Sequence, residues 1–341
     1  MLKMKTCDLT ALYQRLAEMG DLYLPVEVAG KTNFAAWEPD AKVDLKTLKS
    51  VKSPKDVFFP QSEDLYGVQR TDGKMTVVPE TLQETPFVVF GMKACDVRGL
   101  HVLDQVFLTD PVDSFYAARR EHGILVSLAC GRPETSCFCK VFGIDCTEPE
   151  GDVAAWLVED TLYWDPKTEK GEALTEAVKD LLMEADMDAV EQQKASVRSI
   201  VEKLPYSGLS LDQWGAEAAQ KNFDSPLWEQ LYKPCLACGT CTFVCPTCQC
   251  YDIKDYDTGN GVLRYRCWDS CMYSDFTMMA HGNNRTSQMQ RFRQRFMHKL
   301  AYFPANNGGM FSCVGCGRCV DTCPSHLNIV KVIKAFEKEG V

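Results

Sequence analysis

The sequence is poor in histidine and lacks the motifs of several common enzyme classes. Only 5 of its 341 residues are histidine, and no H-E-x-x-H pair is present to bind a catalytic zinc ion. The G-x-S-x-G, Walker A and G-x-G-x-x-G motifs are also missing. These absences argue against a zinc protease, a serine hydrolase and a P-loop enzyme. They also argue against binding of NAD(P) or FAD by this chain itself.

Long apolar runs and an excess of positive charge are missing too. No apolar stretch approaches the ~20 residues of a membrane helix, and the lysines near the N-terminus precede no apolar segment of a signal peptide. The 37 Lys and Arg residues against 47 Asp and Glu residues give a net charge of -10, which argues against nucleic acid as the main partner. We therefore expect a cytoplasmic protein without a membrane span.

Cysteine, in contrast, is abundant, with 18 residues in the chain. Disulfides are rare in the reducing cytosol, so thiols in this number favour ligation of a metal or an iron–sulfur cluster. A chain of 341 residues is long enough for about two domains.

The first half of the chain has the pattern of an α/β domain. Two apolar runs of strand length, residues 86–92 and 123–130, flank a helical pattern over residues 96–108. We also predict a helix over residues 9–19, extended segments over 21–28 and 56–60, a hairpin over 152–164 and a helical connector over 171–222. The fold class is predicted to be α+β, with an α/β domain over residues 1–225 followed by a helical domain over residues 226–341.

The second half contains one cysteine motif twice. The segments CLACGTCTFVCP and CVGCGRCVDTCP both have the C-x2-C-x2-C-x3-C-P spacing of four-iron clusters. In two-cluster ferredoxins the fourth cysteine of each motif binds the other cluster. The predicted ligands are therefore Cys235, Cys238, Cys241 and Cys323 for one [4Fe–4S] cluster, and Cys313, Cys316, Cys319 and Cys245 for the second. Zinc sites also use C-x2-C pairs, but two full motifs that each end in Cys-Pro favour iron–sulfur clusters. Residues 226–341 are therefore predicted to form a helical dicluster ferredoxin domain.

Residues 246–312 separate the two motifs, and this insertion is far longer than the segment between the motifs of a compact ferredoxin. Residues 276–303 of this insertion read mostly as helix, which resembles the helical ferredoxin domains of respiratory-type iron–sulfur subunits. The segment is locally basic over residues 291–299, and we expect a solvated, internally paired helix there rather than a docking face for an acidic partner.

Four more cysteines lie in the first half, where the predicted strands end. Cys95 and Cys130 follow the two strands, and Cys137 and Cys139 form a C-x-C pair shortly afterwards. The carboxyl edge of an open α/β sheet is where such folds place ligands. These four cysteines predict a third [4Fe–4S] cluster. The alternatives are incidental thiols, or a ligand set that uses Cys146 or Asp96 in place of one cysteine.

Segments of both halves resemble one family of proteins. CPTCQCYD, RCWDSCMYSDFT, RFRQRFMHKLAYF and the second cysteine motif are similar to the β subunit of sulfhydrogenases and to the A-type subunit of anaerobic sulfite reductases, as are FFPQSEDLYG, FGMKACDVRGL and SCFCKVFGID. The resemblance covers roughly residues 55–335. It implies an iron–sulfur electron-transfer subunit between a flavin subunit that handles NAD(P)H and a catalytic hydrogenase or sulfite or sulfur reductase subunit.

The remaining cysteines leave an alternative function open. Four of them, Cys248, Cys250, Cys267 and Cys271, would form the reactive site of a catalytic subunit that reduces heterodisulfides or sulfur, or would bind a fourth cluster. The resemblance does not require a cysteine at position 267, and packing beside the clusters is the simpler interpretation. Cys7 has no partner in the pattern.

Overall fold

The computed structural model describes residues 1–339 of the chain. Its largest element is an eight-stranded mixed sheet with the order β10-β1-β9-β8-β7-β6-β2-β3. The four central strands, β8, β7, β6 and β2, pair in parallel, and the outer strands pair antiparallel. The strands are β1 (Leu2–Lys5), β2 (Asp21–Val28), β3 (Lys31–Ala36), β6 (Phe87–Met92), β7 (Gly123–Leu128), β8 (Val153–Val158), β9 (Thr161–Pro166) and β10 (Met183–Glu184).

Alternation along the central strands divides the core between the two faces of this sheet. On β6, Val88 and Phe90 pack with α1 and α5, whereas Phe87 and Val89 pack with α2, α3 and α4. The helices of this half are α1 (Leu9–Ala17), α2 (Lys55–Phe58), α3 (Ala94–Phe107), α4 (Ser114–His122), α5 (Glu169–Ala177) and α6 (Asp188–Glu202). Burial on both faces explains why the central strands read as continuous apolar runs.

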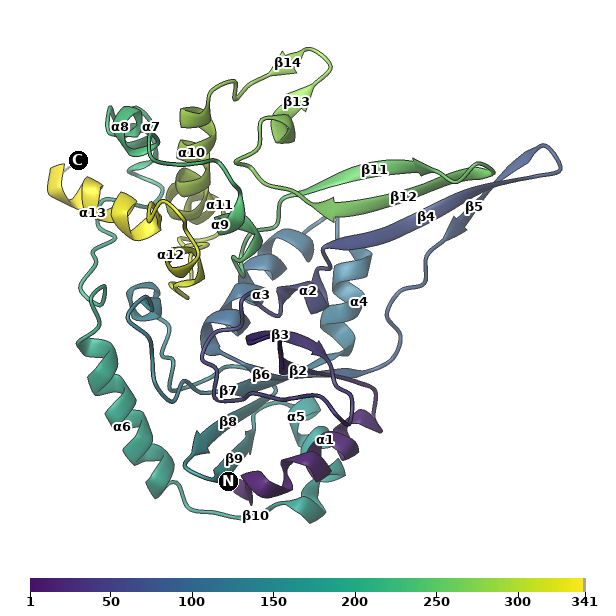
Figure 1. Ribbon diagram of the computed structural model, residues 1–341, viewed down its shortest axis with the longest axis vertical. Coiled ribbons are helices and arrows are strands. Elements are labelled where there is room, and N and C mark those ends of the chain that lie inside the picture. Colours follow the sequence, from purple (N-terminus) through teal and green to yellow (C-terminus); the bar gives the residue numbers. More distant parts are fainter. Residues whose placement is uncertain (340–341) are drawn as a thin grey trace.

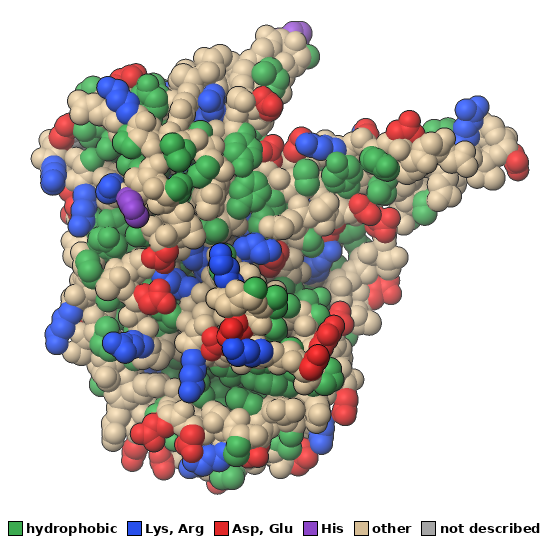
Figure 2. Space-filling model, in the orientation of Figure 1, with side chains coloured by type: hydrophobic (Ala, Val, Ile, Leu, Met, Phe, Trp, Pro, Cys, Tyr) green, Lys and Arg blue, Asp and Glu red, His purple; other side chains and the backbone are tan. Residues whose placement is uncertain are grey.

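A second sheet of four strands projects from the body of the molecule (Figure 1). Its order is β11-β12-β4-β5, so a hairpin from the first half pairs with a hairpin from the second half. Figure 2 shows hydrophobic side chains exposed along this sheet. The strands are β4 (Ser62–Thr71), β5 (Lys74–Pro79), β11 (Tyr251–Asp257) and β12 (Gly261–Trp268).

The remaining helices surround the two cysteine motifs and form a separate apolar core. Trp228, Phe292, Phe296 and Phe336 lie at its centre and are almost fully buried. Its elements are α7 (Ala219–Phe223), α8 (Trp228–Leu231), α9 (Thr240–Phe243), β13 (Met278–Met279), β14 (Gly282–Asn283), α10 (Gln288–Met297), a π turn (His298–Tyr302), α11 (Phe303–Asn306), α12 (Arg318–Asp321) and α13 (Ile329–Glu339). Among residues 1–339, no helix combines the length and hydropathy needed to cross a bilayer.

The α+β class and most elements of the first half are confirmed, and two element predictions were wrong. Residues 56–60 were expected to be extended, but α2 begins after Pro54. The connector over 171–222 is only partly helical, because β10 and a turn-rich segment around Gly208 and Gly215 interrupt it. Residues 276–303 are mostly helical, as expected: a 3-10 helix covers Asp275–Thr277 and the chain is helical from Gln288 onward, and the hairpin of β13 and β14 lies between them.

The predicted boundary after residue 225 stays a prediction. Several contacts join the two halves across it, including the pairing of β4 with β12. Trp268 at the end of β12 packs into the core beside α3 and donates its indole N–H to the Phe59 carbonyl at 3.0 Å. The Arg266 Nε atom donates to Glu63 at 2.6 Å, and its guanidinium also pairs with Asp113.

This buried ion pair predicts a large loss of stability on truncation. The side chains of Arg266 and Glu63 are each 4% exposed, so Arg266→Ala leaves a carboxylate buried, with only Arg119 still paired to it. We expect a loss of about 3 kcal/mol in the free energy of unfolding, measured by chemical denaturation without oxygen. The control is Arg264→Ala on the same strand as Arg266. This substitution removes an exposed ion pair with Asp255 of β11 and should change stability little. Equal losses in the two variants would contradict this account.

Candidate iron–sulfur sites

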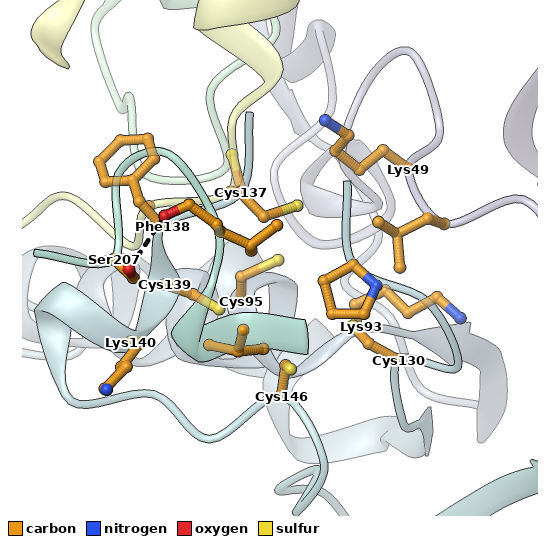
Figure 3. Close-up of a pocket in the computed structure, with 16 residues that line it drawn as sticks. Lys49, Lys93, Cys95, Cys130, Cys137, Phe138, Cys139, Lys140, Cys146 and Ser207 are labelled. Atoms are coloured by element: carbon orange, nitrogen blue, oxygen red, sulfur yellow. Dashed lines mark hydrogen bonds between the residues drawn. The ribbon is translucent and has the colours of Figure 1, made fainter. Parts of the chain in front are cut away.

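The loops after β6 and β7 bring the cysteines of the first half together. Cys95 lies in the first turn of α3, Cys130 follows β7, and the C-x-C pair lies in the loop that leads to β8. All four predicted cysteines line one cavity, together with Cys146 and with Cys316 of the second motif. Figure 3 shows the sulfur atoms of Cys95, Cys137, Cys139 and Cys146 turned toward this space. We call the cavity and its cysteines of the first half, Cys95, Cys130, Cys137, Cys139 and Cys146, the sheet-edge site.

Cys146 lies inside the sheet-edge site, which its position in the sequence did not indicate. Its thiol lies beside the thiols of Cys130 and Cys139, and the Cys130 amide donates to the Cys146 carbonyl at 2.9 Å. The neighbouring Cys146 thiol lowers the pKa of Cys130, whereas burial raises the pKa of Cys137 to about 11. Iron displaces the protons of such thiols when it binds, so raised pKa values do not oppose ligation.

Buried positive charge surrounds this group of thiols. Lys93 is 7% exposed; burial lowers its pKa, and Cys130 and Asp96 counteract this effect. Arg318 comes from the second motif and forms a bidentate pair with Asp96, with N–O distances of 2.6 and 3.1 Å. Because Asp96 is occupied by this ion pair, the structure gives it a different role from the ligand role considered in the sequence. The cationic surroundings fit a group with several thiolates.

The two cysteine motifs share a local conformation. Gly239 and Gly317 precede short helices, α9 and α12, and both adopt left-handed backbone angles with φ of 73° and 81°. Glycine adopts this conformation at little cost, and it turns successive backbone N–H groups toward one side. This is the arrangement that hydrogen-bonds to cluster sulfur in iron–sulfur sites.

The structure brings Cys245, the last cysteine of the first motif, to the second motif. Its charge raises the pKa of Cys313, Cys316 and Cys319, although burial is the largest cause in each case. Cys245 therefore lies near the three cysteines with which the sequence groups it. Cys241 lies near Cys235 and also near Cys319.

The other members of the first predicted ligand set are less closely grouped. Cys238 is exposed, and its thiol donates to the Thr240 hydroxyl at 3.4 Å. Cys323 donates its thiol hydrogen to the Leu327 carbonyl at 3.2 Å. The assignment of Cys323 to the set of Cys235, Cys238 and Cys241 stays a prediction.

The basic segment over residues 291–299 is not the solvated helix expected from the sequence. Arg295 and Lys299 are 2% and 4% exposed, because they lie on the face of the helix that packs against the cysteine motifs. Burial lowers the pKa of Lys299, but Cys245, Cys248 and Cys313 raise it above its ordinary value. Cys241 and Cys319 likewise raise the pKa of Arg295 against the effect of burial.

Neither of these two cations forms an ion pair with a carboxylate in the described part of the chain. Lys299 donates to the Thr247 hydroxyl at 2.6 Å and to the Ser312 carbonyl at 3.2 Å. Arg295 donates to the Cys241 carbonyl at 3.4 Å, and its Nε atom has no partner. A buried cation without an anion is costly. The residues present therefore fit anionic, thiolate-ligated clusters.

Among residues 1–339, no three Cys, His, Asp or Glu side chains converge as ligands of a single metal ion do. A cubane cluster has different requirements, because each cysteine binds a different iron.

Comparisons with known proteins agree with this chemistry. The family described as the 4Fe-4S dicluster domain matches residues 234–327. Over 333 residues the chain is 31% identical to the sulfhydrogenase 2 subunit beta of Pyrococcus furiosus, and the match covers 96% of each chain. The chain belongs to the sulfhydrogenase β-subunit family. It is an iron–sulfur electron-transfer subunit that binds [4Fe–4S] clusters. No solved structure matches the chain significantly.

Sequence reasoning did not predict that three lysines are buried beside the cysteine groups, or that Cys146 lies in the sheet-edge site. The buried cations Lys55, Lys93 and Lys299 carry no motif, and a lysine in a helical or turn pattern reads as solvated. Cys146 was considered only as a substitute ligand. Its spacing from Cys139 is the one signal that relates it to the C-x-C pair.

The contact between the sheet-edge site and the second motif predicts an effect of Gly315→Ala. Gly315 has a φ of 60°, and a Cβ atom there would lie 2.5 Å from the backbone of Phe138, between the two thiols of the C-x-C pair. Gly308 has a φ of 59° with nothing within 4 Å of an added Cβ, so Gly308→Ala carries the same backbone strain without the clash.

We expect Gly308→Ala to cost about 1 kcal/mol and to keep the iron content. Gly315→Ala should lower both the thermal denaturation midpoint and the iron bound per chain, measured in protein purified without oxygen. Equal effects of the two substitutions would show that the close approach of these backbones is unimportant.

Proposed function

We propose that this chain relays electrons between a flavin subunit that handles NAD(P)H and a catalytic subunit, either a hydrogenase or a sulfite or sulfur reductase. Iron–sulfur clusters supply one-electron carriers whose potentials depend on their surroundings. The main observation behind this proposal is the continuity of the cysteine groups. Cys316 belongs to the second motif and also lines the sheet-edge site, so both groups meet at one residue. The family relationship supports the proposal, and we expect such a complex in the cytoplasm.

The proposed ligand sets follow from the groups described above. Cys235, Cys238, Cys241 and Cys323 would bind one cluster, Cys313, Cys316, Cys319 and Cys245 a second, and Cys95, Cys130, Cys137 and Cys139 a third. Cys146, whose thiol contacts Cys130 and Cys139, would then be a hydrogen-bond donor to ligand sulfur, a role that tunes the potential of a cluster.

The exposure of the cysteine groups indicates which end of the relay meets a partner subunit. The sheet-edge cysteines and Cys316 are buried or half-buried, whereas Cys238 is exposed and its neighbour Leu236 is 68% exposed. An exposed apolar side chain beside a ligand is where a partner subunit would exclude water and approach the cluster. We therefore propose that the loop of residues 235–241 is the end of the relay that meets a partner.

The catalytic alternative has weaker support. It needs Cys248, Cys250, Cys267 and Cys271 in one group, but Cys267 lines a different cavity, with Asp252 and Asp269. The relay also explains why no nucleotide-binding motif is present, because the flavin subunit would bind NAD(P)H.

The relay predicts the result of replacing both cysteines of the C-x-C pair. Cys137→Ser with Cys139→Ser should remove about four irons per chain and leave the irons of the ferredoxin motifs, since a cubane needs four ligands. The control is Cys7→Ser, at an exposed cysteine outside every group, which should lose no iron. Iron and acid-labile sulfide are measured in protein purified without oxygen.

The same preparations test the relay itself. NAD(P)H should reduce the clusters only when a flavoprotein that co-purifies with the chain is present, and electron transfer should fail in the double variant. A chain that oxidises NAD(P)H or reduces substrate alone would contradict the proposal, as would an unchanged iron content in the double variant.

A further inference from the structure

Three cysteines that the proposed relay does not use lie together beside the second motif. Cys248 and Cys250 follow the first motif, and Cys271 lies in the turn after β12. Cys250 and Cys271 lie close together and line the same cavity, and Cys248 lies near both. Cys248 also lies near Cys245, the last cysteine of the first motif. We call Cys248, Cys250 and Cys271 the three-cysteine group.

A buried lysine faces this group without a carboxylate partner. Lys55 is 3% exposed, its Nζ atom donates to the Cys248 carbonyl at 2.8 Å, and it lies 3.8 Å from the centroid of the Trp268 ring. Among the described residues no acidic side chain forms an ion pair with it. Burial lowers its pKa, and Cys248 is the largest influence in the opposite direction. A buried ammonium in this position requires a nearby anion.

The same pattern occurs at the other cysteine groups. Lys93 faces the sheet-edge site, and Arg295 faces Cys241 and Cys319 of the motifs. Lys299 lies near both the second motif and the three-cysteine group, because both Cys313 and Cys248 raise its pKa. Each of these buried cations therefore lies beside a group of thiols that would become thiolates when iron binds, and Lys55 lies beside the three-cysteine group.

The group also borders an open cavity of about 670 Å³. Cys250 and Cys271 line it, with Gln294 and His298 from the end of α10. The chain forms a π turn over His298–Tyr302 at this point, a conformation that is rare and concentrated at functional sites. Burial lowers the pKa of His298 to about 4, which keeps its imidazole neutral. The cavity leaves room beside the thiols.

We propose that Cys248, Cys250 and Cys271 hold a further [4Fe–4S] cluster, whose fourth iron faces this cavity. Thiolates are the ligands that iron–sulfur clusters prefer, and iron displaces their protons on binding. Cys267 is not a member, because it lines another cavity. The site goes beyond the proposed relay, since none of its three ligands belongs to the ligand sets proposed above. The iron without a cysteine ligand is open to a small ligand from the cavity.

The first test is the iron content of variants of the full chain, purified without oxygen. Cys248→Ser, Cys250→Ser and Cys271→Ser should each remove about four irons per chain. Cys267→Ser is the matched control, because Cys267 precedes the same turn, and it should lose none. An iron content equal to that of the unchanged chain in all three variants overturns the proposal. Loss of iron at the C-x-C pair is measured separately, so a failure of the relay is distinguishable from a failure of this site.

The second test needs no variant and therefore does not depend on folding. The unchanged, iron-loaded chain is treated with iodoacetamide, and alkylation is located by mass spectrometry. Cys250 should be protected with iron bound and labelled after iron is removed, although it lines an open cavity. Exposed Cys7 should be labelled in both states. Labelling of Cys250 in the iron-loaded chain, or recovery of Cys250 and Cys271 as a disulfide, overturns the proposal.

Discussion

The structure depends on burying positive side chains against cysteine sulfur. Lys55, Lys93, Arg295 and Lys299 are all at least nine-tenths buried, and among residues 1–339 none of the four pairs with a carboxylate. In an ordinary core such charges would be strongly destabilising. The thiols beside them become anionic when iron binds, so we expect the iron-free chain to be the less stable state. We therefore expect folding and loading with iron to be coupled in this protein.

The same constraint explains how the two halves are joined. The sheet-edge site is completed where Arg318 of the second motif reaches Asp96 on α3 and where the Phe138 amide donates to the Gly315 carbonyl at 2.9 Å. A glycine is needed at position 315 because the backbones approach too closely for a Cβ atom. Each half thus contributes to a region that electrons would cross, and the contacts that hold the halves together also fix the relative positions of the cysteine groups.

Sequence reasoning found the parts of this arrangement that are local. The spacing of the two motifs and the strand-end positions of Cys95 and Cys130 follow from patterns within a few residues, so these features were predictable. The pairing of β4 with β12 was not, because it joins segments about two hundred residues apart, and the Asp72-Gly73 turn predicts only the local pairing of β4 with β5. The buried cations were missed for a related reason: whether Lys299 is solvated or buried depends on tertiary packing, and its helical segment reads as an ordinary basic surface.

The most direct test of this account is a redox titration of Lys299→Met, followed by electron paramagnetic resonance. Reduction adds negative charge to a cluster, and a nearby buried cation favours it, so loss of Lys299 should make the midpoint potential of at least one ferredoxin cluster more negative. The control is Lys194→Met on α6, whose equally buried ammonium pairs with Glu148 and Glu191, and it should shift no potential. Potentials that stay unchanged in the iron-loaded Lys299→Met chain would contradict the claim that buried cations balance the charge of the clusters.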